Sequence, residues 1–309
     1  CSVNCPTIDT ASSKASGAGA MRFTVPVGGY GAHAGEWWQN WSDDLSAQYG
    51  AGQNFYVQLR LRADANMAAS GYWKAAYLAN AGDRAGCTSG STGNCRSSCT
   101  QLEWNIQTYQ PGWQAWRLYN GCPGSSIFIE TGLGGGDFAP QNNRASPFCT
   151  YNQILAGQQF SPTGNCFKIW ANEWLTVSGA FQIGTRGGGA ESLPCEGSSG
   201  KANCYYNSNI AIKLGREGQA TENTWLWTGA INADTVANDE KFGKTWLTPY
   251  SSPEVLPNGG NLWYDEFIVS TAAIADPGAS GISTAMVSRT GAGRTISVGA
   301  GKTLSIVVQ

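Results

Sequence analysis

Cys99-Thr-Gln-Leu-Glu-Trp-Asn-Ile-Gln-Thr-Tyr109 is the stretch of sequence that decides the fold. From Gln101 to Gln107, polar and apolar residues alternate strictly. Because side chains of a β-strand point alternately to its two faces, this pattern predicts a strand with one buried apolar face. The opposite face carries amides around one carboxylate, from Gln101, Glu103, Asn105 and Gln107. Such a row is suited to hydrogen-bonding a polyhydroxylated ligand, and an ordinary solvated sheet face is the alternative interpretation.

The same two-residue period recurs along the chain and predicts further strands. Phe55–Ala63 and Glu173–Ile183 alternate most clearly. Other predicted strands are Met21–Val27, Gly71–Ala79, Gly112–Asn120, Ile127–Glu130, Asn209–Arg216, Thr224–Thr228, Lys244–Tyr250 and Asn261–Ser270. The chain shows no βαβ rhythm and no convincing amphipathic helix, so these strands favour an all-β fold. We predict an antiparallel jelly-roll β-sandwich over residues 1–278, with long disulfide-stapled loops.

Residues 279–309 differ in composition from the rest, being rich in Gly, Ser, Thr and Val. They contain two strand-like pieces, Thr295–Val298 and Thr303–Val308. We expect a small β extension at the C-terminus that need not share the main core. Self-assembly through this extension is one of its possible uses.

The bulk composition narrows the class of protein. The chain has 309 residues, 41 of them Gly and 13 Trp, and only 13% are charged. This composition fits a many-stranded sandwich with long loops. A formal net charge of −2 argues against nucleic acid as the main partner, because phosphate binding needs a basic surface. No apolar run approaches the roughly 18 residues that suggest a transmembrane helix.

Ten cysteines and a single histidine indicate disulfides rather than a zinc site, since no CxxC pair is present. Disulfides imply an oxidising compartment, so we expect a secreted or cell-surface protein. Short loops favour the pairings Cys1–Cys5, Cys87–Cys95, Cys99–Cys122, Cys149–Cys166 and Cys195–Cys204. Lipid attachment at Cys1 is the alternative use of the first cysteine.

Several segments together resemble those of concanavalin A-like lectin/glucanase sandwiches, in particular the polysaccharide-lyase-like branch. The resemblance covers roughly residues 20–275 and rests on five pieces: Phe55–Arg62, Gln101–Gln107, Asn172–Val177, Lys241–Leu247 and Leu262–Ser270. The Glu-x-Asp-x-x-Glu strand of the similar glucanases is absent. The strand Gln58-Leu-Arg-Leu-Arg62 lacks the central Glu of the lyase motif, and Asn105-Ile-Gln107 stands where a His would be expected.

The resemblance implies β-elimination of a uronate-bearing polysaccharide. That reaction needs a cation or amide to neutralise the carboxylate, a base and an acid. Arg60 is a candidate for neutralising the carboxylate, and Tyr119 or Tyr250 for proton transfer. His33, in a loop that could overhang a groove, is a further catalytic candidate. The alternatives are an arginine salt-bridged to Glu103, tyrosines that only pack and a surface histidine. Candidate substrate-binding residues are Arg62, Gln101, Glu103, Asn105, Gln107, Lys244 and Trp246.

Other chemistries have weaker support in the sequence. A retaining glycosidase would need a second carboxylate beside Glu103, for which Glu130 and Glu266 are the candidates. No cofactor and no resident metal are predicted; Ca²⁺ binding by Asp265 or Glu266 is the alternative. Nucleophile-elbow, P-loop, zincin and dinucleotide-binding motifs are absent.

The sequence therefore predicts a carbohydrate-active protein that binds and cleaves a uronate-containing polysaccharide by β-elimination. Two alternatives stay open: a non-catalytic carbohydrate-binding or adhesion module, and a structural subunit of a surface fibre or virion. The first prediction requires a set of side chains to meet in one open groove, namely Arg60, Glu103, Gln107 and Lys244.

Overall fold

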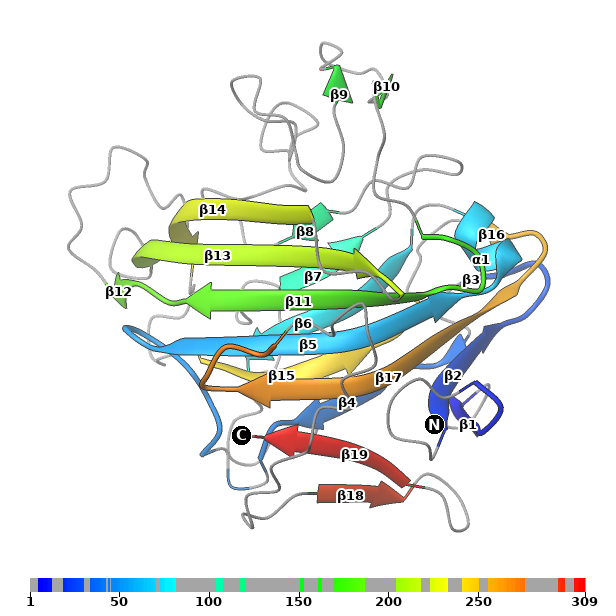
Figure 1. Cartoon of the computed structure of the whole chain (residues 1–309), viewed down its shortest axis with the longest axis horizontal. Coiled ribbons are helices and arrows are strands. Elements are labelled where there is room, and N and C mark those ends of the chain that lie inside the picture. The colour runs from blue at the N-terminus through cyan, green and yellow to red at the C-terminus, as the bar shows by residue number, and fades with distance from the viewer. Residues whose placement is uncertain are drawn as a thin grey trace.

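The computed structural model is built almost entirely of β-strands (Figure 1). It describes residues 5–12, 19–30, 34–42, 44, 46–70, 73–81, 104–107, 117–119, 151–152, 161–162, 169–186, 204–217, 223–232, 241–249, 255–275, 294–297 and 303–308. One helix of five residues, α1 (Ala65–Ala69), occurs in this described part. The prediction of a mostly β fold is confirmed for the described residues.

A ten-stranded sheet, here called the large sheet, forms one layer of the molecule. Its main path runs β1 (Thr7–Asp9), β2 (Ala20–Val25), β17 (Gly260–Ser270), β5 (Asn54–Ala63), β11 (Trp174–Gln182), β13 (Cys204–Arg216) and β12 (Thr185–Arg186). Three further strands join it: β14 (Asn223–Asn232) beside β13, β19 (Thr303–Val308) beside β17, and β18 (Arg294–Ser297) beside β19. All of these pairings are antiparallel except the one between β17 and β19.

A five-stranded sheet, here called the small sheet, lies behind the large sheet in Figure 1. Its order is β4 (Trp37–Asn40), β15 (Phe242–Leu247), β6 (Lys74–Ala81), β7 (Trp104–Gln107) and β8 (Arg117–Tyr119). Two short ladders complete the described strands: β3 (Gly29–Tyr30) with β16 (Val255–Leu256), and β9 (Tyr151–Asn152) with β10 (Ser161–Pro162). The predicted antiparallel sandwich is thus confirmed, and the jelly-roll connectivity stays a prediction.

Aromatic side chains from both sheets fill the centre of the core. The rings of Phe55 and Phe181 stack with centroids 4.7 Å apart, and Tyr49 stacks on the other side of Phe55 at 5.1 Å. Phe242 of the small sheet closes the cluster at 5.4 Å from Phe55. Stacked aromatic pairs add about 0.5–1.5 kcal/mol beyond the area they bury. This cluster fixes which face of each strand points inward.

The outward faces of the two sheets follow from that assignment. In β5, Val57, Leu59 and Leu61 belong to the buried core, so Gln58, Arg60 and Arg62 lie on the outer face of the large sheet. In β15, Leu247 belongs to the core and Thr245 accepts a hydrogen bond from the core residue Trp41 at 2.8 Å. Lys244 and Trp246 therefore lie on the outer face of the small sheet. These two outer faces are on opposite sides of the sandwich.

The C-terminal extension is joined to the main sandwich by its last strand. β19 pairs in parallel with β17 through Ile268 opposite Val307 and Val269 opposite Val308. β2 pairs with the first half of the same edge of β17, from Gly260 to Tyr264. The division of the chain at residue 278 stays a prediction, but β19 continues the large sheet.

Three smaller findings bear on the sequence predictions. Cys5 is disulfide-bonded, and the side chains of the other cysteines lie outside the described residues, so the pairings stay predictions. No helix in the described part of the chain is long and apolar enough to cross a membrane. The same residues contain no group of three or more His, Cys, Asp or Glu arranged to hold a metal ion.

Candidate functional site

The outer face of the small sheet carries a transverse row of residues from all five strands. Backbone register pairs Trp246 with Trp38 on one side and with Tyr77 on the other. Tyr77 in turn pairs with Asn105, which pairs with Tyr119. Residues directly opposite each other on neighbouring strands lie on the same face of a sheet. The row thus brings Asn105 and Tyr119, both predicted from sequence, to adjacent positions.

A second row lies two residues further along β7. Gln107 pairs with Lys74 of β6 and with Arg117 of β8. Because Gln107 and Asn105 are two residues apart in one strand, they share a face. The second row therefore places two cationic residues and an amide beside the tyrosine-containing row.

By register, both rows alternate with a row of positions that begins in the core. Leu247, which is buried in the core, pairs with Ala76, and Ala76 pairs with Ile106. Ile106 then pairs with Leu118. This apolar row alternates with the polar ones, as the pattern of residues 101–107 predicts. We call the positions that alternate with this apolar row the polar face; it comprises Lys74, Tyr77, Asn105, Gln107, Arg117 and Tyr119.

Lys244 and Trp246 share the outward side of the small sheet, but the protein itself covers them. The side chain of Lys244 is completely buried, and Trp246 is only 7% exposed. A side chain with no exposed surface does not touch a ligand in this conformation. The burial of Lys244 does not fit the predicted substrate contact.

Arg60 lies on the opposite side of the sandwich, on the outer face of the large sheet. Its Nε donates to Glu266 Oε2 at 2.9 Å, and its Nη1 donates to Thr176 Oγ1. The side chain is 9% exposed, so its guanidinium is satisfied inside the protein. The expected convergence of Arg60 with Gln107 and Lys244 is not found, because β5 and β7 belong to different sheets. An ion pair was the alternative interpretation, although its partner is Glu266 rather than Glu103.

A β-bulge in β17 supplies that partner. The register with β5 shifts between Asp265 and Ile268, so one extra residue is inserted, and Glu266 has a φ of 48°. The bulge turns the Glu266 carboxylate toward Arg60. It also removes Glu266 as a glycosidase partner for a carboxylate next to β7, since β17 belongs to the other sheet.

Arg62 lies on the same outer face as Arg60 and stacks over Trp263. The other predicted site residues, His33, Gln101, Glu103, Glu130 and Tyr250, lie outside the described residues. Their roles stay predictions.

Sequence reasoning missed Lys74, Tyr77 and Arg117. Arg117 is two residues from Tyr119, so the period of two was sufficient to place both on one face. Lys74 and Tyr77 are three residues apart, and a regular strand would put them on opposite faces. The register of β6 against β7 shifts between Lys74 and Ala76, and this irregularity brings both to the polar face.

The polar face combines residue types that suit acid–base chemistry on a carboxylate-bearing sugar. Lys74 and Arg117 supply positive charge, and Gln107 supplies an amide that donates and accepts hydrogen bonds. Tyr77 and Tyr119 supply hydroxyl groups able to give or take a proton. By the fold and this set of residues, the molecule is an antiparallel β-sandwich with a polar face on its smaller sheet.

Comparisons with known proteins bear on the fold. No family model matches the chain, and no curated protein matches its sequence. Among solved structures, the chain is similar to a PL-14 alginate lyase from Aplysia kurodai, with a TM-score of 0.47, 14% identity and 85% of each chain covered. It is also similar to an endo-β-1,4-glucuronan lyase from the fungus Trichoderma reesei, with a TM-score of 0.43, 14% identity and 85% of each chain covered.

Proposed function

We propose that the chain is a secreted or cell-surface protein that binds a uronate-containing polysaccharide along the polar face and cleaves it by β-elimination. One observation supports the proposal: in the register of β6, β7 and β8, Lys74 and Arg117 pair with Gln107, and Tyr77 and Tyr119 pair with Asn105. Arg60, which the sequence prediction required beside Gln107, belongs to the other sheet. In this proposal the neutralising role therefore passes to Lys74, Gln107 and Arg117. Cys5 in a disulfide supports an oxidising compartment.

The row of Lys74, Gln107 and Arg117 has the residue types that neutralise a uronate carboxylate. Positive charge and amide hydrogen bonds near the carboxylate stabilise the extra negative charge that builds up when the adjacent C–H bond loses its proton. This row therefore lowers the barrier to proton removal. An arginine adds the planar fork that fits a carboxylate with two parallel hydrogen bonds.

The row of Tyr77, Asn105 and Tyr119 supplies proton transfer. In the reaction, an ionised tyrosine oxygen takes the proton from the carbon next to the carboxylate, and the electron pair of the C–H bond stays on that carbon. This pair forms a carbon–carbon double bond as the bond from the neighbouring carbon to the glycosidic oxygen breaks, and that oxygen takes a proton from a tyrosine hydroxyl. Asn105, between the two tyrosine positions in the register, orients the sugar by hydrogen bonds.

The dimensions of the polar face fit a polymer. Residues two apart in a strand are about 6.6 Å apart, so the two rows are separated by about this distance. Neighbouring strands lie about 4.8 Å apart, so the three strands β6, β7 and β8 span about 10 Å. A short run of sugar residues therefore meets both rows at once.

The test is a search for unsaturated product. Alginate, glucuronan, heparin and pectin are incubated with the protein, and the ultraviolet absorbance of the new double bond is followed. Wild-type protein forms product from at least one polymer, and Tyr119→Phe or Gln107→Ala lowers kcat about 100-fold or more. Ser178→Ala is the matched control, because Ser178 hydrogen-bonds Gln58 on the outer face of the large sheet.

Two results would contradict the proposal: no product from any uronate polymer, or full activity in both polar-face variants. Binding of a polymer without product would instead support the second candidate, a non-catalytic carbohydrate-binding module. The amides of Asn105 and Gln107 favour that candidate, because they bind sugar hydroxyls without needing a base.

A further inference from the structure

A row of two arginines and a tryptophan lies on the outer face of the large sheet, on the opposite side of the sandwich from the polar face. Trp263 of β17 pairs with Arg22 of β2 on one side and with Arg62 of β5 on the other. Leu262 and Tyr264, its neighbours in β17, are buried in the core, so Trp263 and its two partners face outward.

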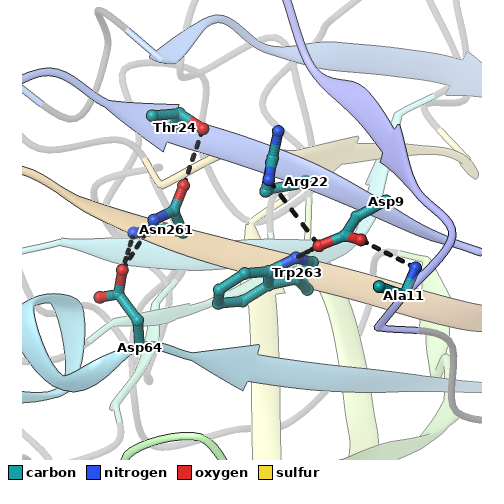
Figure 2. A network of polar contacts seen from close by, with 7 residues as sticks. All are labelled: Asp9, Ala11, Arg22, Thr24, Asp64, Asn261 and Trp263. Atoms are coloured by element: carbon teal, nitrogen blue, oxygen red, sulfur yellow. Dashed lines mark hydrogen bonds and ion pairs between the residues drawn. The ribbon is translucent and has the colours of Figure 1, made fainter.

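The tryptophan ring is held in place between the two arginines. Its Nε1 donates to Asp9 Oδ2 at 2.8 Å, as Figure 2 shows, and the ring is 8% exposed. The Arg62 Cζ atom lies 5.0 Å from the centre of the ring, which is a cation–π distance. Trp263 thus serves as a rigid support that fixes one guanidinium.

Arg22 forms a long ion pair with Asp9, and neither Arg22 nor Arg62 has every guanidinium nitrogen satisfied among the described residues. The Nε atoms of Arg22 and Arg62 are buried and have no hydrogen-bond partner there. The carboxylate nearest Arg22 is Asp9, whose Oδ2 is 3.8 Å from Arg22 Nη1, beyond hydrogen-bond distance. Asp9 already accepts hydrogen bonds from Trp263 and from the Ala11 N–H.

Other arginines of the large sheet show the contrast. Arg216 donates to both carboxylate oxygens of Glu173 at 2.7–3.0 Å, and Arg60 donates to Glu266. A buried guanidinium nitrogen without an acceptor is costly, and natural structures usually satisfy it with a partner. The Nε groups of Arg22 and Arg62 can therefore donate to a hydrogen-bond acceptor that is not among the described residues.

We propose that Arg22 and Arg62, on either side of Trp263, form a binding site for the oxyanion group of an acidic glycan, a carboxylate or a sulfate. The guanidinium fork matches two oxygens of such a group. The side chain of Arg22 is 40% exposed, so a group on a polymer reaches it. The buried Trp263 ring offers no surface for stacking a nucleic-acid base, and the net charge of −2 does not favour a nucleic acid. The site is separate from the polar face and anchors a glycan without contributing to its cleavage.

The experiment follows the indole N–H resonance of Trp263 while the protein is titrated with anions. The resonance is assigned by its loss in Trp263→Phe. Three probes are used: inorganic sulfate, an oligogalacturonate that bears carboxylates only, and a heparin oligosaccharide that bears sulfates. A shift with the oligogalacturonate but not with sulfate assigns a carboxylate site, and the reverse assigns a sulfate site.

Variants separate a built site from general charge. Arg22→Gln/Arg62→Gln weakens binding about tenfold or more, whereas Arg216→Gln removes the same type of charge and changes binding less than about twofold. Arg62→Lys keeps the charge but loses the fork, so it also weakens binding and serves as the mild variant if the double variant does not fold. Thermal melts confirm folding of each variant.

Absence of any shift of the Trp263 resonance with all three probes would overturn the proposal. Equal weakening in Arg216→Gln and the double variant would do the same, because it would show that bulk charge is responsible. Product formation on the polar face is expected to be unchanged in the Arg22 and Arg62 variants. The anchoring site and the lyase proposal are thus tested separately.

Discussion

The two partners of the ion pair between Arg60 and Glu266 differ in burial. This difference determines how much stability is lost when either partner is replaced. Arg60 is 9% exposed, whereas Glu266 is 22% exposed. An unpaired charge costs more where water is further away. Removing the carboxylate therefore leaves an unpaired guanidinium that is more buried, and so more costly, than the unpaired carboxylate left by removing the guanidinium.

We expect Glu266→Gln to lower the free energy of unfolding by about 2–3 kcal/mol and Arg60→Met by about 1 kcal/mol. Gln has the length of Glu and leaves the backbone at φ 48° unaltered, so backbone strain does not enter the comparison. Urea unfolding of both variants measures the difference. A larger loss in Arg60→Met than in Glu266→Gln would show that the pair is not held as the burial implies.

Asp9 links the N-terminal strand to β17 and makes part of the stability dependent on pH. Partial burial acts to raise its pKa, but hydrogen bonds from Trp263, Ala11 and Ser12 and the charge of Arg22 together bring the pKa below its ordinary value of 3.8. A carboxylate whose pKa is lowered by folding stabilises the protein above its ordinary pKa. That contribution is lost as the pH falls through the pKa of the folded state.

Asp9→Asn is thus expected to be less stable than wild type at pH 7, by less than about 1 kcal/mol, because the amide keeps an acceptor oxygen for Trp263 and its charged neighbour Arg22 is 40% exposed. The difference should close as the pH falls below about 4. Thermal unfolding of both proteins at several pH values checks this. A gap that stays constant down to the lowest pH would mean that the ionised carboxylate makes no contribution.

Among the elements, α1 depends on one carboxylate that also belongs to the packing of β17. Asp64 caps the helix by accepting from the Met67 N–H at 2.9 Å. Its second oxygen accepts from the backbone N–H of Asn261 at 2.7 Å and from the Asn261 side chain at 2.8 Å (Figure 2). The residue is a helix cap and a link between β5 and β17 at once.

Asp64→Ala is expected to cost about 2–3 kcal/mol, more than the roughly 1 kcal/mol of an ordinary helix cap. Asp44→Ala is the matched control, because Asp44 is exposed and its described hydrogen bonds come from Ser46 nearby. We expect the control to leave the free energy of unfolding nearly unchanged. Equal losses in a chemical denaturation experiment would refute the linking role of Asp64.

The strands were predictable because polar and apolar residues alternate along them in the sequence. Predicted bounds such as Phe55–Ala63 and Thr303–Val308 agree with β5 and β19 to within one residue. The helix α1 was missed because a five-residue helix has too few turns to show a hydrophobic stripe. Its capping residue, Asp64 before Ala65, was the available signal.

The candidate site was predictable only in part. A period of two shows which residues share one face of a strand, but it does not show which sheet the strand joins. Asn105, Gln107 and Tyr119 share a face, as the sequence patterns of two neighbouring strands implied. The pattern of β5 placed Arg60 outward correctly but held no information about which sheet contains β5. The shared face of Lys74 and Tyr77 could not be predicted, because it depends on a register shift in β6 for which the sequence gives no local signal.

At the scale of the whole molecule, the two outer faces differ in what covers them. Polar residues in the middle of the large sheet, including Gln58, Thr176 and Asp265, are buried. Gln58 Nε2 donates to the carbonyl of Ala275 at 3.4 Å, so the segment after β17 turns back over this face. The centre of the large sheet is therefore an internal polar layer.

The outer edge of β17 is shared by β2 and β19. Deleting residues 279–309 removes β19 and leaves the backbone groups near Ile268 and Val269 without their strand partner. Unpaired sheet edges promote association between copies. We expect the shortened protein to elute as larger species in size-exclusion chromatography than the full chain does. If the full chain forms the larger species and the shortened one does not, the extension acts as an assembly arm instead.

Hydrogen exchange measured with and without uronate oligomers tests most directly which face binds the substrate. The oligomers are taken from alginate and glucuronan, and the Tyr119→Phe variant is used so that they are not consumed. The account predicts slower amide exchange in β7 and β8, with no change in β5 and β11. Protection confined to β5 and β11, or none anywhere with either polymer, would contradict it.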